Sequence, residues 1–68
     1  MKYQDIPASV LEVAIDEWIH NERNRRIVKR RLIDGICYEP LAEEFSLSVR
    51  QVKNIVYKSE EIIFAKFK

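Results

Sequence analysis

The chain has 68 residues, a net charge of +1, and 47% apolar against 34% charged residues. This length predicts one small domain over residues 1–68, and the composition excludes a disordered tail or a Gly/Ser linker. Cys37 is the only cysteine and His20 the only histidine, so we expect no disulfide framework, no metal site and no cofactor. Without a Gly-rich phosphate loop or a Ser/His/Asp set, we expect no catalytic residues and no enzyme. The apolar runs are too short for a membrane span and no signal peptide is visible, which together with the unpaired thiol predicts a cytoplasmic protein.

The first half of the chain predicts two helices, because its apolar residues recur at three- and four-residue spacing. The first is predicted over about 7–20, beginning either with Pro7 in its first turn or with a Ser9–Glu12 capping box. Its apolar stripe, which we expect to face the core, consists of Val10, Leu11, Ala14, Ile15, Trp18 and Ile19. The second helix is predicted over about 22–34, because Gly35 stands where helices commonly end in a left-handed residue.

The second half predicts a short helix over about 38–45, with Cys37 at its start, and a longer helix over about 49–66. Ser48 and Gln51 have the spacing of a capping box, which marks the beginning of this fourth helix. Its core-facing stripe is predicted to be Val52, Val56, Ser59 and Ile63. The pattern leaves open whether the late apolar residues pack on the first helix or form a homodimer patch; they are Ile62, Ile63, Phe64 and Phe67. The fold class is thus all-α, a small four-helix domain.

Residues 36–59 have the layout of a helix-turn-helix, with a short helix, a tight turn and a second helix that begins with a hydroxyl cap. Ala42 is small enough to let the two helices approach, and Leu47 fills the angle between them. We therefore expect the fourth helix to enter the major groove of double-stranded DNA. The predicted DNA-binding residues are Ser48, Val49, Arg50, Gln51, Lys53, Asn54, Tyr57 and Lys58. Among them, guanidinium and amide groups suit base edges, and the ammonium groups suit phosphates.

The second helix carries a run of basic residues between two acidic segments. Within residues 23–31 every charged side chain is basic: Arg23, Arg25, Arg26, Lys29, Arg30 and Arg31. Arg26, Lys29 and Arg30 are candidate phosphate contacts. The alternative use of this run is pairing with the acidic residues of the first and third helices.

These residues together resemble region 4 of bacterial sigma factors, a helix-turn-helix module that reads promoter DNA. The matching positions are Gly35, Leu41, Ala42, Ser48, Val52, Val56, Ser59 and Ile63. The resemblance spans residues 22–63 and implies a stand-alone DNA-binding transcriptional regulator, because the chain has no room for a region 2. It also implies RNA polymerase as a further partner. The chain departs from the family pattern at Ser46, where glycine is usual, so we expect Ser46 in a strained turn conformation.

A competing hypothesis keeps the fold and changes the partner. In this alternative the chain is a protein-interaction module that binds RNA polymerase or a partner regulator without reading DNA. One feature distinguishes the two hypotheses. DNA binding requires a single uncovered basic face formed by Arg50, Lys53, Asn54 and Lys58, and the alternative does not.

Overall fold

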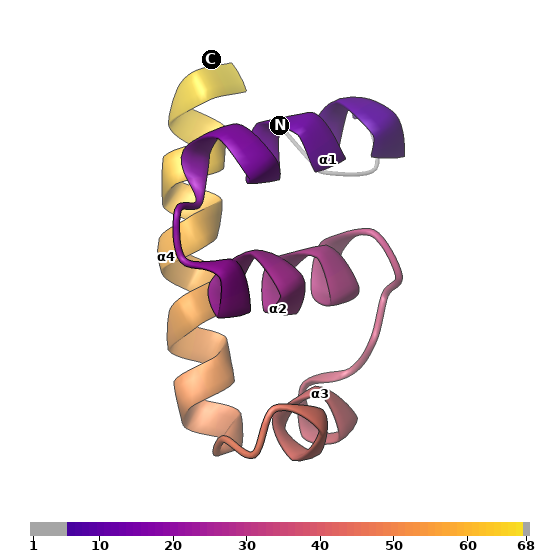
Figure 1. Cartoon of the computed structure of the whole chain (residues 1–68), viewed down its shortest axis with the longest axis vertical. Helices are drawn as coiled ribbons and strands as arrows, with labels where there is room; N and C mark the ends of the chain where they lie inside the picture. Colours follow the sequence, from indigo (N-terminus) through magenta and orange to yellow (C-terminus); the bar gives the residue numbers. More distant parts are fainter. Residues whose placement is uncertain (1–5, 68) are drawn as a thin grey trace.

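The computed structural model of the protein describes residues 6–67 and arranges them in four α-helices. Their bounds are Ala8–Trp18 for α1, Glu22–Leu32 for α2, Tyr38–Glu44 for α3 and Val49–Phe67 for α4. Figure 1 shows α4 along the long axis of the molecule, with α1, α2 and α3 packed one after another along its length and α3 nearest to its start. This part of the chain holds no strand, which confirms the predicted all-α, four-helix architecture. No helix within residues 6–67 has both the length and the apolar character needed to cross a membrane.

Two clusters of buried side chains form the core, and α2 and α4 contribute to both. The cluster shared by α1, α2 and the later part of α4 contains Leu11, Ile15, Ile19, Val28 and Ile63. The cluster shared by α2, α3 and the earlier part of α4 contains Ile27, Leu41, Ala42, Val52 and Val56. Ile27 and Val28 are neighbours in sequence and face different clusters. The helix α2 is therefore the layer that joins α1 to the α3–α4 pair.

The predicted core stripe of α4 is confirmed, including its one polar member. Val52, Val56 and Ile63 are completely buried, and Ser59 is 4% exposed. The Ser59 hydroxyl donates a hydrogen bond of 2.8 Å to the carbonyl oxygen of Ile55. Because this bond satisfies the hydroxyl group, a serine is tolerated in an otherwise apolar interface.

The ends of α1 and α2 lie inside their predicted ranges. Pro7 occupies the N-cap position of α1, and no side chain caps this helix. The expected Ser9–Glu12 capping box is therefore wrong, because Ser9 already lies within the helix. The helix α2 ends at Leu32 rather than near residue 34, and Gly35 takes the predicted left-handed conformation with a φ of 72°.

The predicted apolar stripe of α1 is wider than the surface that the fold buries. Leu11, Ala14 and Ile15 are buried, whereas Val10 is 45% exposed and Trp18 is 39% exposed. The expectation that Val10 and Trp18 belong to the core is therefore wrong. The reason is geometric: only α2 and the later part of α4 pack against α1, and they cover one side of its stripe.

The apolar residues near the C-terminus are buried to different extents. Ile63 is buried in the cluster with α1, Phe64 is half-buried, and Ile62 is 43% exposed. The side chain of Phe67 lies outside the described part of the chain.

Candidate nucleic-acid interface

The turn between α3 and α4 is defined by backbone hydrogen bonds. The Leu47 N–H donates to the carbonyl oxygen of Ala42 at 2.9 Å, and the Ser46 N–H donates to that of Glu43 at 3.2 Å. This pair of bonds is the Schellman motif, which requires a left-handed residue after the helix. Ser46 supplies it with a φ of 56°, which confirms the predicted strain at this non-glycine position. Leu47 then packs against the α3–α4 cluster, so the turn has little freedom.

The predicted capping box at the start of α4 is confirmed. The Ser48 hydroxyl accepts a hydrogen bond from the backbone N–H of Gln51 at 3.1 Å. In return the Gln51 side-chain oxygen accepts one from the backbone N–H of Ser48 at 2.9 Å. The cap fixes the first turn of α4. It also engages the side-chain oxygen of Gln51 in an internal hydrogen bond. By contrast, the side chains of Arg50 and Asn54 make no hydrogen bond or ion pair with residues 6–67.

An uncovered side of α4 lies opposite its buried stripe. The exposed predicted DNA-binding residues are Ser48, Arg50, Gln51, Lys53, Asn54, Tyr57 and Lys58. Val49 differs from them, because it is half-buried against the cluster that holds α3. Successive residues of a helix are turned by about 100°, so Arg50 and Asn54 lie on nearly the same line. We call the four side chains Arg50, Lys53, Asn54 and Lys58 the α4 polar face.

Tyr38 connects this face to the rest of the molecule. The ammonium nitrogen of Lys53 lies 5.5 Å from the centre of its ring, and the guanidinium carbon of Arg31 lies 4.3 Å from the same centre. The ring of Tyr57 meets it edge-on at a centroid distance of 6.4 Å. These contacts hold Lys53 at the edge of the face next to α3, which leaves Arg50 and Asn54 at its middle.

Part of the basic run of α2 is used inside the molecule. Lys29 lies 2.7 Å from the Asp16 carboxylate and 3.8 Å from that of Glu12, both on α1. Arg30 lies 2.7 Å from Glu44 on α3. For Lys29 and Arg30 the structure therefore has the pairing that the sequence left as an alternative to phosphate contact. Arg26 is exposed and makes no ion pair within residues 6–67.

Two carboxylates limit the cationic surface toward the C-terminus of α4. Glu61 is exposed and follows Arg50 and Asn54 on the same line of the helix, so a polyanion is repelled beyond it. Glu60 is half-buried, and this burial raises the pKa of its carboxyl group, while the nearby charge of Arg31 acts in the opposite direction. On α4, the surface suited to an anionic partner is thus confined to the first half of the helix.

Sequence reasoning missed a hollow beside the α4 polar face, in which polar groups stand among apolar side chains. It has a volume of about 390 Å³ and lies between α4 and the α1–α2 connection. Its polar lining includes Asn54 and Lys58 from α4 and His20, Asn21 and Asn24 from the connection and the start of α2. Only the packing of α2 against α4 brings these groups together, so no local pattern in the sequence indicated them.

Comparisons with protein-family models, with curated proteins and with solved structures find no significant match to this chain. The resemblance to region 4 of sigma factors therefore depends on the residue pattern alone. What the geometry adds is a rigid turn, a capped helix and a polar face whose middle is free of internal partners.

Proposed function

We propose that this protein is a sequence-specific DNA-binding transcriptional regulator that inserts the first half of α4 into the major groove. The single observation that carries the proposal is the α4 polar face, where Arg50 and Asn54 are exposed and have no partner within residues 6–67. The resemblance to region 4 of sigma factors supports the same function. A cytoplasmic location and RNA polymerase as a further partner belong to the proposal as well.

The chemistry of the middle of the face suits base recognition. Arginine can donate two hydrogen bonds to the guanine edge, and asparagine can both donate to and accept from the adenine edge. Arg50 and Asn54 lie one helical turn apart, so both side chains can reach bases in one groove. The Schellman turn and the capping box hold the start of α4 in one orientation, so little order has to be gained on binding.

The flanks of the face suit the phosphate backbone. Lys58 shares its hollow with His20, Asn21 and Asn24, whose side chains can donate hydrogen bonds to phosphate oxygens. Lys53 lies on the opposite flank, beside Tyr38. Bases would therefore be read in the middle and phosphates held on both sides.

The proposal is tested by titrating a preferred and a scrambled duplex across salt concentrations, the preferred one taken from a random-library selection. Arg50→Ala or Asn54→Ala should cost about 1–3 kcal/mol of binding free energy on the preferred duplex and relax the preference at one base position. Lys58→Ala should weaken both duplexes alike and reduce the salt slope by about one unit.

A matched variant separates charge from base recognition at the same position. Arg50→Lys keeps the positive charge and loses the paired donors, so it should retain binding to the scrambled duplex while losing preference for the selected one. If Arg50→Ala and Asn54→Ala leave both titrations unchanged while circular dichroism shows the native helix content, α4 does not enter the groove and the proposal is wrong.

A second candidate function is favoured by the exposed apolar residues on α1, Val10, Val13 and Trp18. In this alternative the protein binds RNA polymerase or a partner regulator without reading DNA. Polymerase binding that survives Arg50→Ala, together with no retention of the protein on DNA at low salt, is the result that selects it.

A further inference from the structure

The side-chain amide of Gln51 is divided between the helix and the solvent. Its oxygen accepts a hydrogen bond of 2.9 Å from the backbone N–H of Ser48, while its NH₂ group makes no hydrogen bond within residues 6–67. This contact fixes which amide atom is the oxygen, because an NH₂ group in its place would set two donors against each other. Gln51 therefore offers an outside partner its donors, while its acceptor is engaged in the cap.

Gln51 lies where a recognition helix comes closest to the bases. It is the third residue of α4, which begins at Val49, and it is exposed. The first residues of such a helix are the ones that contact base edges in the major groove. Lys58 follows seven residues later, or nearly two full turns, so the two side chains lie on the same side of α4. Gln51 thus stands beside Arg50, at the edge of the α4 polar face.

The four bases differ in what they present to such a donor in the major groove. Guanine and thymine carry a keto oxygen, which accepts a hydrogen bond, whereas adenine and cytosine carry an amino group, which donates one. Each base pair contains one keto base and one amino base. A group that only donates therefore distinguishes the two orientations of a pair, because it favours the one that places the keto base on the contacted strand.

The cap opposes the adenine contact that a free glutamine side chain can make. Paired hydrogen bonds to adenine require the amide oxygen and nitrogen to face the base together. In Gln51 the oxygen faces the backbone at the start of α4, so this geometry requires it to leave the cap. The Ser48 N–H would then lose the partner that the capping box gives it.

We propose, on the basis of the entry of α4 into the major groove proposed above, that Gln51 acts as a donor alone and selects a keto base, guanine or thymine, at one position of the DNA site. The capping hydrogen bond persists in the complex and leaves the NH₂ group of Gln51 for the base. The same bond that begins the helix thus sets a base preference.

Selection from a random duplex library with wild type and with Gln51→Met locates the contacted position, because methionine has a similar length and no N–H donor. Wild type is then titrated against four duplexes that differ only in this base pair. G·C and T·A in one orientation should both bind about fivefold or more tightly than the reversed pairs C·G and A·T. Lys58→Ala, on the same side of α4, should weaken all four duplexes alike. Circular dichroism verifies that each variant is folded.

Gln51→Glu supplies the sharper test, because glutamate also completes a capping box and replaces the NH₂ group with an acceptor. The added negative charge should lower the affinity for every duplex. The preference should nevertheless invert, so that C·G and A·T bind about fivefold or more tightly than G·C and T·A. Since neither a loss of folding nor a change of charge can invert a base preference, the inversion reports on the hydrogen bond itself.

Two results would overturn the inference. A preference for one orientation of the A·T pair alone shows that Gln51 leaves the cap to bind adenine. An unchanged base preference in both Gln51→Met and Gln51→Glu shows that Gln51 reads no base. In either case, a relaxed preference in Arg50→Ala and Asn54→Ala leaves the proposed DNA binding intact, and only the absence of any base preference in wild type removes both.

Discussion

Ser46 takes a left-handed backbone conformation, with a φ of 56°, although it carries a side chain. For residues other than glycine this conformation is unfavourable by about 1–2 kcal/mol. Ser46 is exposed and its hydroxyl forms no hydrogen bond within residues 6–67. No interaction of its side chain therefore offsets the strain. The sequence pattern of sigma region 4 has glycine at this position, whereas here the Schellman turn forms with serine.

We predict that Ser46→Gly raises the free energy of unfolding by about 0.5–1 kcal/mol in urea titrations. The gain is smaller than the strain itself, because glycine also gives the unfolded chain more freedom. Gly35→Ala is the matched reverse change. Gly35 has a φ of 72°, and a Cβ there would meet no atom within 4 Å, so strain alone should destabilise this variant by about 1 kcal/mol. Destabilisation by Ser46→Gly would show that the serine hydroxyl is needed in the turn.

At the scale of elements, α2 connects its two neighbours through charge as well as through the core. Lys29 binds the acidic side of α1, and Arg30 binds Glu44 of α3. Exposed ion pairs contribute only about 0–1 kcal/mol each, so the buried clusters hold the helices while these pairs favour one orientation. Part of the alternation of acidic and basic segments in the sequence is thus an internal complementarity between neighbouring helices.

The interface between α2 and α4 contains a carboxyl group whose ionisation should oppose folding. Burial raises the pKa of Glu60, with Arg31 partly offsetting the effect. The folded protein then holds this proton more tightly than the unfolded chain. The stabilisation from the neutral form is complete below the unfolded pKa and is lost as the pH rises through the folded pKa.

We therefore predict that the free energy of unfolding of wild type decreases as the pH rises through the raised pKa of Glu60. In the Glu60→Gln variant this decrease should be absent. Because the side chain is only half-buried, the difference should be about 0.5 kcal/mol or less at neutral pH. Urea titrations of wild type and variant at a series of pH values measure it as a difference, which cancels the other titrating groups. Glu61→Gln, at the exposed neighbouring position, should follow the wild-type curve; if both variants behave alike, the environment of Glu60 is not the cause.

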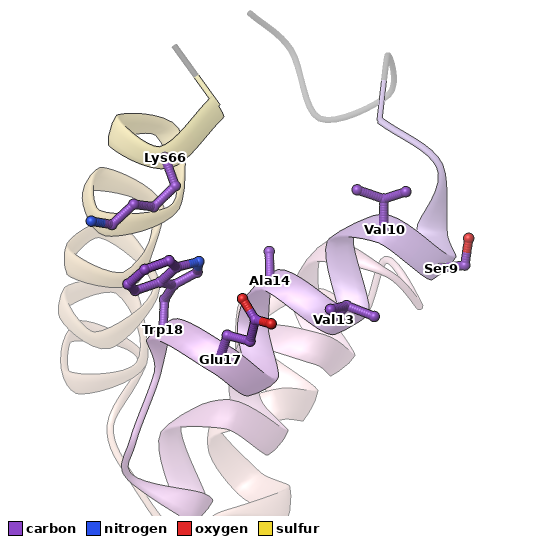
Figure 2. A pocket seen from close by; sticks show the side chains of 7 residues that line it. All are labelled: Ser9, Val10, Val13, Ala14, Glu17, Trp18 and Lys66. Carbon is purple, nitrogen blue, oxygen red and sulfur yellow. The ribbon is translucent and has the colours of Figure 1, made fainter.

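For the whole molecule, α4 separates the polar face from the exposed apolar side of α1. Its first half carries the polar face, and Lys66 near its end lines the apolar groove on α1 together with Val10, Val13 and Trp18 (Figure 2). With a rise of about 1.5 Å per residue, Arg50 and Lys66 are roughly 24 Å apart along the helix axis. DNA bound at the start of α4 would therefore leave this side of α1 uncovered.

A single module buries only about 600–1,000 Å² of protein surface on DNA, so we predict that one copy of this chain binds a duplex weakly. Equilibrium sedimentation with and without the duplex measures which assembly binds. Tight one-to-one binding by a monomer at physiological salt would contradict this prediction and leave base recognition by α4 standing.

The sequence by itself determined the features that depend on residues close together in the chain. The four helices, the left-handed Gly35, the Ser48–Gln51 capping box and the buried stripe of α4 all follow from spacings of a few residues, because hydrogen bonds of turns and caps are local. The strain at Ser46 was predicted from a departure at one position of a family pattern. The exposed side of α4 follows in turn, since it is the side opposite the stripe.

Only the tertiary structure decided which surfaces stay uncovered and which charges meet. The exposure of Val10 and Trp18 depends on how much of α1 is covered by α2 and α4, and a helical period cannot reveal the width of that contact. Lys29 and Arg30 became internal partners because α1 and α3 pack on either side of α2. These outcomes come from contacts between segments distant in sequence, whose geometry is set by the packing of whole helices and not by the residues next to them.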